Sequence, residues 1–117
     1  MKGGAESWHQ ITLAGYLDRA QVVWCHVPNG GRRGKREAAE LRLSGVKAGV
    51  PDVLVFTPAT NAPKGCALEL KAPGGRVSDE QRTWLEQLAR LGWAVVVAYG
   101  YEDALVQLKS LGYEVPA

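Results

Sequence analysis

The sequence predicts an α/β fold, a mixed β-sheet flanked by helices, with the element order α-β-α-β-β-α-β-α along 117 residues. Segments whose apolar residues recur at helical spacing alternate with short β-branched and aromatic runs, which are typical of strands. Strands and helices mixed in this way imply a sheet covered by helices on both faces. Because 46% of the residues are hydrophobic and no linker or repeat divides the chain, we expect a single domain, residues 1–117, with one modest core.

The first part of the chain predicts two helices with a strand between them. Residues 6–19 carry apolar side chains close to helical spacing and form the first helix. Residues 21–27 (QVVWCHV) form a strand, and residues 28–34 (PNGGRRG) form a loop because they are rich in glycine. Residues 35–45 (KREAAELRLSG) form the second helix, whose final glycine is a typical C-terminal stop.

The second part predicts a hairpin followed by a helix, a strand and a last helix. Residues 52–56 (DVLVF) and 66–71 (CALELK) are the strands of the hairpin, because the turn between them holds two prolines. Ser78 opens the third helix, with Gln81 three residues later in a capping-box arrangement. Residues 93–99 (WAVVVAY) predict a strand buried on both faces, and residues 102–112 predict a helix that ends at a glycine.

The composition excludes several classes of protein. Charged residues make up 22% of the chain, which is ordinary for a globular protein and argues against disorder. No apolar run approaches the roughly 20 residues of a membrane span, and the N-terminal stretch MKGGAESWHQ lacks the apolar segment of a signal peptide. Cys25 and Cys66 have no metal-type spacing and are interpreted as reduced core thiols, so a cytoplasmic location is expected.

Positive charge is concentrated in one part of the chain. Between residues 32 and 47 there are six cations and two anions, which give this window a net charge of +4, so the rest of the chain sums to −2 within an overall charge of +2. The asymmetry predicts a local basic face. The six cations are Arg32, Arg33, Lys35, Arg36, Arg42 and Lys47.

Charged residues also occur where the predicted strands should be buried. Strand residues alternate between faces, so Glu69 and Lys71 share one face, and Asp52 can lie near Glu69 if the two strands pair. Two carboxylates that converge beside a lysine form an oxygen-ligand site suited to Mg²⁺ or Mn²⁺, which would hold a phosphate oxygen and lower the pKa of a bound water. The alternative is an ion pair between Glu69 and Lys71 on an exposed sheet face, and these three residues alone do not decide between the two.

Longer motifs around these residues indicate a family. The Pro-Asp pair at residues 51–52, followed by ELK at residues 69–71 after a strand, turn and strand, resembles the PD-(D/E)XK nuclease superfamily. The ordered set HVPNGG, LRLSGVKAGVPDVLVF and LELKAPGGRVSDEQRTWLEQLARLGWAVVVAYG is similar to the VRR-NUC family, the virus-type replication-repair nucleases. This resemblance covers nearly the whole chain and implies a restriction-endonuclease-like fold.

The resemblance also implies roles for particular residues. Asp52 and Glu69 match the metal-binding carboxylates of the family, and Lys71 matches its catalytic lysine. The backbone carbonyl of Leu70 would complete the metal shell, and Glu6 matches an acidic residue on the first helix that often joins the site. Gln81 matches the glutamine on the helix behind the motif, which is compatible with its capping role.

Contacts to DNA are expected from the loop and the basic window. His26 lies at a strand end and has two possible roles. It either contacts the DNA or the metal site, or it makes a structural hydrogen bond. The backbone amides around the glycines can approach a phosphate, and the cations can contact the DNA backbone. The expected DNA-binding residues are His26, Asn29, Gly30, Gly31, Arg32, Arg33, Lys35, Arg36 and Lys47.

The predicted function is that of a Mg²⁺- or Mn²⁺-dependent DNA endonuclease acting on branched DNA such as Holliday junctions or flaps. Small members of the family imply a homodimer in a bacterial or phage-infected cell, and Trp84 or Trp93 are candidate interface residues. The alternative from another class is a non-catalytic module that binds DNA junctions as a subunit. It does not explain why Asp52, Glu69 and Lys71 are all present.

Overall fold

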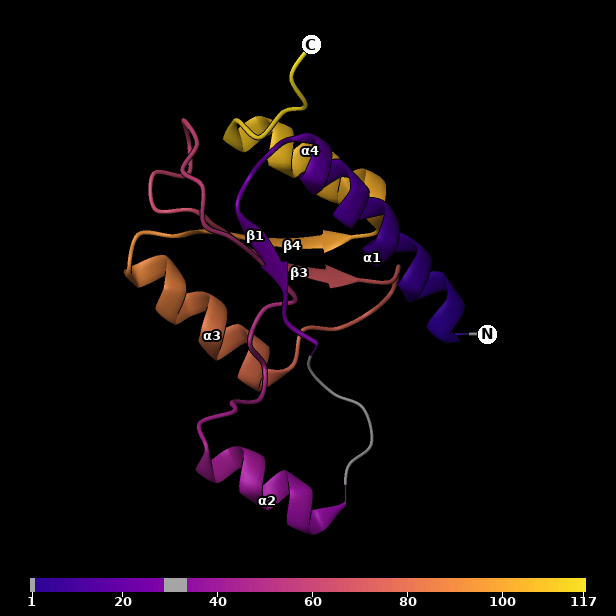
Figure 1. Ribbon diagram of the computed structural model, residues 1–117, viewed down its shortest axis with the longest axis vertical. Coiled ribbons are helices and arrows are strands. Elements are labelled where there is room, and N and C mark those ends of the chain that lie inside the picture. Colours follow the sequence, from indigo (N-terminus) through magenta and orange to yellow (C-terminus); the bar gives the residue numbers. More distant parts are fainter. Residues whose placement is uncertain (1, 29–33) are drawn as a thin grey trace.

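The computed structural model describes residues 2–28 and 34–117, with side chains described from Ser7 onward in the first helix. Four strands form one sheet in the order β1-β2-β3-β4. The predicted element order is confirmed (Figure 1). The elements are α1 (Lys2–Arg19), β1 (Trp24–His26), α2 (Lys35–Leu43), β2 (Val53–Val55), β3 (Cys66–Lys71), α3 (Asp79–Arg90), β4 (Ala94–Tyr99) and α4 (Tyr101–Leu111).

The sheet is mixed, as predicted. Strands β1 and β2 pair antiparallel, and β2 and β3 form the expected antiparallel hairpin with Val53 opposite Leu68. Strand β4 pairs parallel with β3, so the chain must cross over between them, and α3 lies in that crossover. This arrangement places the end of β3, the start of β2 and the start of α3 close together.

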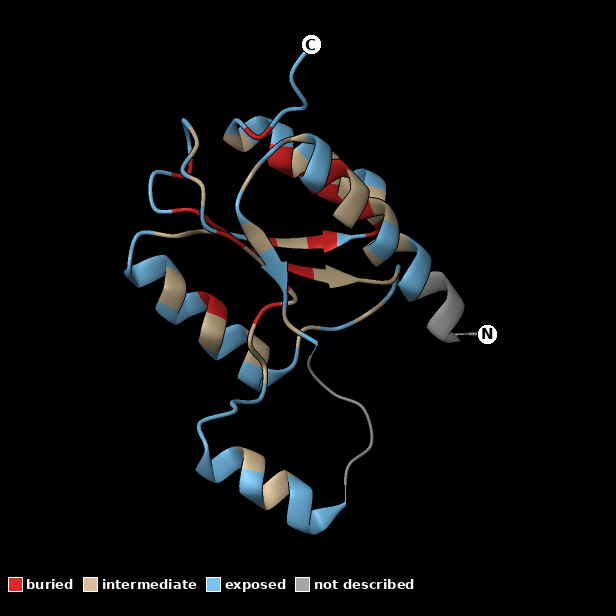
Figure 2. Ribbon diagram, in the orientation of Figure 1, coloured by how far each residue is buried: buried red, intermediate tan, exposed pale blue. Residues whose placement is uncertain are grey.

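Helices cover both faces of the sheet (Figure 1). Helices α1 and α4 lie side by side on one face, and α3 lies on the other. The main core lies between the sheet and the α1–α4 layer, where Figure 2 shows most of the buried segments. Its fully or almost fully buried side chains include Leu13, Tyr16, Leu17, Val53, Val55, Cys66, Leu68, Val96, Ala98 and Leu108.

Strand β4 is at the edge of the sheet and is less buried than the sequence predicts. Val96 and Ala98 are buried against the core, but Val95 is 37% exposed and Tyr99 is 45% exposed. The prediction of burial on both faces is wrong because α3 covers only part of the second face. The outer edge is partly protected, since Gln107 Nε2 donates to the Val97 carbonyl at 3.0 Å and the Tyr99 amide donates to Asp103 Oδ2 at 2.9 Å.

The two cysteines differ in their environment. Cys66 is buried, and burial raises the pKa of its thiol to about 12, so it fits the predicted core thiol. Cys25 is exposed, and its assignment to the core is wrong. It lies on the edge strand β1 opposite Leu54, on the face that points away from the main core.

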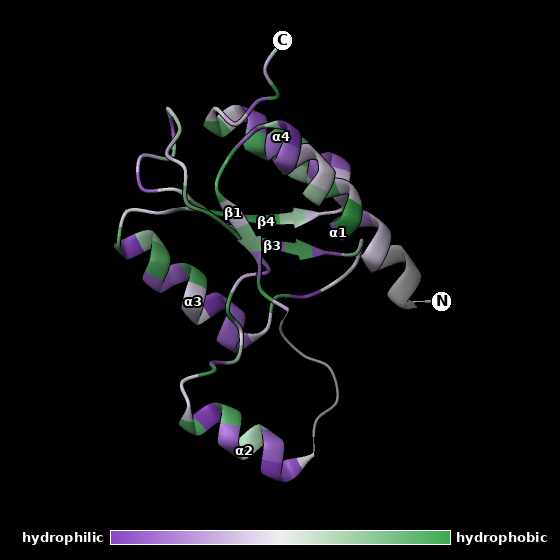
Figure 3. Cartoon of the chain, viewed as in Figure 1, coloured by the Kyte–Doolittle hydropathy of each residue, from purple (hydrophilic) through white to green (hydrophobic). Residues whose placement is uncertain are grey.

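Helix α2 projects from the rest of the fold (Figure 1). It has no buried residue, as Figure 2 also shows, and much of it is hydrophilic in Figure 3. Lys35, Arg36 and Arg42 on this helix and Lys47 after it are exposed. Across the described residues, no helix has the length and apolarity needed to cross a membrane.

Candidate active site

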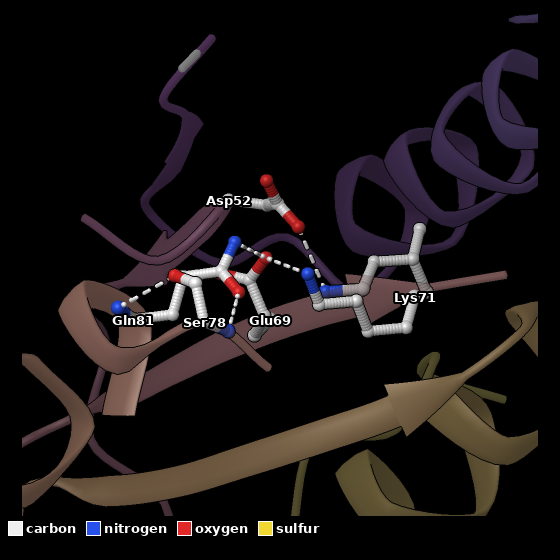
Figure 4. Close-up of polar contacts among 6 residues, drawn as sticks. Asp52, Glu69, Lys71, Ser78 and Gln81 are labelled. Atoms are coloured by element: carbon white, nitrogen blue, oxygen red, sulfur yellow. Dashed lines mark hydrogen bonds and ion pairs between the residues drawn. The ribbon is translucent and has the colours of Figure 1, made fainter. Parts of the chain in front are cut away.

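A cavity of about 410 Å³ opens at the end of the sheet where β3 leaves the core. Its walls come from α1, from the end of β1, from the residue before β2, from β3 and from α3. The cavity brings together Asp52, Glu69, Leu70, Lys71, Gln81 and His26, which are six of the residues expected at the site. Figure 4 shows Asp52, Glu69, Lys71 and Gln81 converging.

Asp52 is held by both neighbouring strands. Its Oδ2 accepts a hydrogen bond from the Leu70 amide of β3 at 2.8 Å. Its backbone carbonyl accepts from the Val27 amide at 2.7 Å and lies 2.8 Å from His26 Nδ1. Because a carbonyl can only accept, His26 Nδ1 carries a proton, which leaves its Nε2 as the acceptor in the neutral ring. His26 therefore has a structural hydrogen bond and also lines the cavity.

Glu69 is the only buried charged residue in the part of the chain that the structure describes, with 3% of its surface exposed. Its Oε2 accepts from Gln81 Nε2 at 2.9 Å and lies 3.6 Å from Lys71 Nζ. Its Oε1 is buried and has no hydrogen-bond donor within the described residues. An ion pair on an exposed sheet face does not fit this burial, and the orphaned oxygen needs another partner.

Both carboxyl groups hold a proton more tightly than they would in water. Burial raises the pKa of Asp52, against the opposing effect of the Leu70 amide that bonds it. Burial and the nearby Asp52 charge raise the pKa of Glu69 from 4.5 to about 7, although Lys71 opposes the shift. Below a pH of about 7 the pair therefore retains a proton when no cation is present.

Gln81 is oriented by the cap of α3. The Gln81 amide donates to Ser78 Oγ at 3.1 Å, and the Ser78 amide donates to Gln81 Oε1 at 2.8 Å, so the predicted capping box is present. Since Oε1 is occupied as an acceptor, Nε2 is turned toward Glu69 (Figure 4). One side chain thus caps a helix and fixes a carboxylate.

The backbone of Leu70 faces the β2 side of β3, where its amide bonds Asp52. The carbonyl of Gly65, just before β3, accepts from the Ala94 amide of β4, and the carbonyl of Lys71, at the end of β3, accepts from the Gly100 amide just after β4. Odd-numbered residues of β3 therefore direct their backbone groups to the β4 side. Even-numbered residues of β3 direct their backbone groups to the β2 side, as Leu70 does when its amide bonds Asp52. Since the N–H and C=O of one strand residue point to the same side, the Leu70 carbonyl also points to the side of β3 on which Asp52 lies.

The family of the chain follows from a sequence comparison. The VRR-NUC domain matches residues 4–102. The chain belongs to the VRR-NUC family. A solved structure described as a VRR_NUC domain protein is 22% identical, with a TM-score of 0.72 over 92% of this chain and 87% of that chain, and it supports the fold. Among the curated proteins compared with it, none matches this chain. VRR-NUC membership makes this a nuclease-type domain, with DNA as the substrate class.

Not every expected VRR-NUC site residue can be placed. Glu6 lies on α1 next to Ser7, which lines the cavity, but its side chain is outside the described residues. Asn29, Gly30, Gly31, Arg32 and Arg33 also lie outside the described residues. Lys35, Arg36 and Lys47 are exposed and do not line the cavity.

Helix α1 contributes a wall that sequence reasoning missed. Ser7, His9, Gln10 and Ile11 line the cavity. The only signal was their position within five residues of Glu6 on a predicted helix. Which face of that helix meets the site depends on its packing, which the periodicity does not define.

The donor set fits a divalent cation. Within the described residues there is no group of three or more His, Cys, Asp and Glu side chains that could hold a metal ion. However, two carboxylates and a backbone carbonyl are the oxygen ligands that Mg²⁺ and Mn²⁺ prefer, and the orphaned Glu69 Oε1 is a buried ligand atom without a partner. The family is typically metal-dependent, and these residues agree with that.

The loop before Asp52 packs closely on the start of α3. Gly49 has a φ of +86°, and a Cβ placed there would lie 2.6 Å from the Glu80 carbonyl carbon and 2.8 Å from the Gln81 amide nitrogen. A side chain at this position would therefore push the loop that carries Asp52 away from the helix that carries Gln81.

We expect Gly49→Ala to lower both stability and cleavage, because it combines a positive φ with a backbone clash. Gly45→Ala is the matched control, since Gly45 has a φ of +105° but nothing within 4 Å of the added Cβ. The control should lose only the stability that the strain of the left-handed conformation costs, about 1–2 kcal/mol. Urea unfolding and a cleavage assay measure the two effects, and equal losses in both variants would contradict the proposed packing.

The raised pKa of Glu69 predicts how stability depends on pH in a chelating buffer. Since its folded pKa of about 7 exceeds its ordinary value of 4.5, the folded state binds the Glu69 proton more tightly than the unfolded state does. The stabilisation of the fold by this proton is complete below 4.5 and is lost as pH rises through about 7. The free energy of unfolding should fall over this interval, by on the order of 3 kcal/mol at most. Glu69→Gln should flatten the fall. Parallel pH profiles for wild type and this variant would contradict the assignment.

Proposed function

We propose that this VRR-NUC chain is a Mg²⁺- or Mn²⁺-dependent endodeoxyribonuclease that cuts branched DNA such as four-way junctions or flaps. One observation carries the proposal: two carboxylates converge in an open cavity, with a buried oxygen of Glu69 lacking any donor in the described structure and Lys71 Nζ at 3.6 Å from the same carboxylate. This is the arrangement expected for metal-assisted phosphodiester hydrolysis.

Each residue of the cavity has a distinct part in this proposal. Asp52, Glu69 and the Leu70 carbonyl would hold the cation, and Glu6 is proposed as a further carboxylate from α1. When bound, the cation would supply Lewis-acid stabilisation of the phosphate and a lowered pKa for the attacking water. Gln81 keeps the Glu69 carboxylate in one orientation through its 2.9 Å hydrogen bond.

Lys71 supplies positive charge at the same place. Its side chain is 16% exposed, so its ammonium group lies in a partly desolvated position next to the open cavity. A cation at such a position stabilises the negative charge that develops on the phosphate during hydrolysis. The two carboxylates alone would repel the negatively charged phosphate, and the positive charge of Lys71 offsets part of that repulsion.

DNA binding outside the cavity is proposed for the basic window. Helix α2 buries none of its residues, and Lys35, Arg36 and Lys47 are exposed on and after it. The neighbouring Arg32 and Arg33 add charge in the sequence. Contacts of this type give affinity for the DNA backbone with little sequence preference.

The alternative function is a junction-binding module without catalysis. Both functions predict DNA binding, so cleavage of labelled linear, flap and four-way DNAs with each metal distinguishes them. Cleavage that depends on Asp52 and Glu69 supports the nuclease. Binding to branched DNA without cleavage under either metal supports the module.

We expect Asp52→Asn and Glu69→Gln to reduce cleavage by about a thousandfold or more, since they remove ligands of the cation. Lys71→Ala should also lose cleavage but retain bound metal. The matched control is Glu86→Gln, an exposed carboxylate on α3, which should cleave like wild type. DNA binding should survive in all four variants. Wild-type cleavage by either carboxylate variant would show that the metal site lies elsewhere.

Removing Arg32, Arg33 and Arg36 together should weaken binding to all DNA sequences alike. The slope of log K against log salt should flatten by about 0.9 for each phosphate contact that is lost. The control replaces three other exposed cations, Lys64, Arg90 and Lys109. This control should leave the slope unchanged. An equal effect in both triple variants would mean that DNA binding depends on the net charge of the protein and not on contacts by these arginines.

A homodimer is proposed because two sites are needed to nick a two-fold symmetric junction, and a C₂ dimer supplies them. Trp84 and Trp93, both half-buried, are proposed as interface residues. Light scattering should show a dimer at micromolar concentration with a four-way DNA present. A monomer with and without DNA would remove the junction substrate and leave a flap or end nuclease.

A further inference from the structure

His9 of α1 is fixed in the cavity by a backbone hydrogen bond. Its Nδ1 accepts from the Tyr101 amide at 2.8 Å, at the first residue of α4. The preceding residue is Gly100, where an added Cβ would lie 3.3 Å from the His9 ring, so the ring lies against the backbone. Trp8 contacts the ring edge-on, with ring centroids 5.0 Å apart. The imidazole therefore has little freedom to turn.

This hydrogen bond determines the tautomer. An amide N–H can only donate, so Nδ1 of His9 is the acceptor and carries no proton. The proton of the ring is then on Nε2, which is a hydrogen-bond donor. Within the described part of the chain, Nε2 of His9 has no hydrogen-bond partner, although His9 lines the cavity.

His9 is also held at a fixed position relative to Lys71. The Gly100 amide donates to the Lys71 carbonyl at 2.9 Å, and the next amide in the chain, that of Tyr101, donates to His9. Two consecutive peptide groups thus connect the lysine of the site to the imidazole. This connection uses no side chain other than that of His9.

We propose that His9 contacts the substrate, with its Nε2–H donating a hydrogen bond to a non-bridging phosphate oxygen of DNA in the cavity. This rests on the proposed function, because it names the group that the site binds. Phosphate oxygens only accept hydrogen bonds, while Asp52 and Glu69 offer acceptors. The cavity therefore needs donors, and His9 is a neutral one in the lining that also includes Lys71. The competing role is a helix cap for α4 alone.

Two substitutions separate these roles. His9→Asn retains an acceptor in place of Nδ1 but has no donor in place of Nε2. His9→Gln retains a donor near Nε2 but loses the acceptor for Tyr101. We expect the asparagine variant to melt like wild type and to lose about 10- to 100-fold in kcat/KM on DNA, the effect of one hydrogen bond to a charged group. The glutamine variant should melt lower yet cleave better than the asparagine variant.

If His9 only caps α4, the asparagine variant will cleave like wild type, and the proposal is overturned. If wild type cleaves no DNA, the proposed function fails, and a second measurement still decides the role of His9. Long-range ¹H–¹⁵N correlation on the histidine rings of the wild-type protein should show His9 protonated at Nε2. Inorganic phosphate added at constant pH should shift the His9 signals saturably. A proton on Nδ1, or no shift with phosphate, would overturn the proposal.

Discussion

The burial of Glu69 beside Asp52 is the constraint on which the rest of this site depends. A carboxylate that is 3% exposed, with one oxygen lacking a donor among the described residues, is unfavourable unless something offsets its charge. Lys71 at 3.6 Å offsets part of it. The remainder is met either by a proton shared between the two carboxyl groups or by a divalent cation. The same geometry that raises the pKa of Glu69 to about 7 would also favour a bound divalent cation.

Most contacts that support this pair involve backbone atoms. The Leu70 amide bonds Asp52, the capping box of α3 orients Gln81 toward Glu69, and Gly49 allows the Asp52 loop to lie against α3. Backbone contacts are set by strand register and helix position rather than by side-chain rotamers. The position of the site thus follows from the packing of the sheet and α3, which suits a reaction that needs its charges in place before the substrate arrives.

Much of this site could be predicted from the sequence because local rules determine it. The period of a strand places Glu69 and Lys71 on one face, and hairpin pairing brings Asp52 opposite Glu69. The spacing of Ser78 and Gln81 predicts the capping box. The rest depends on packing between distant segments. The burial of Glu69 depends on how α3 packs against β3, and the approach of His9 to α4 depends on how α1 lies. The exposure of Cys25 and Tyr99 follows from the strand order, which places β1 and β4 at the edges.

The central claim is that a cation replaces a proton on the Asp52–Glu69 pair. Calorimetric titration of Mn²⁺ in buffers of different ionisation enthalpy measures the number of protons released on binding. Below the Glu69 pKa of about 7 the account predicts release of about one proton per cation, falling toward zero well above it. Glu69→Gln should bind Mn²⁺ weakly and release none. Tight binding to this variant, or binding to wild type without proton release at the lower pH, would contradict the account.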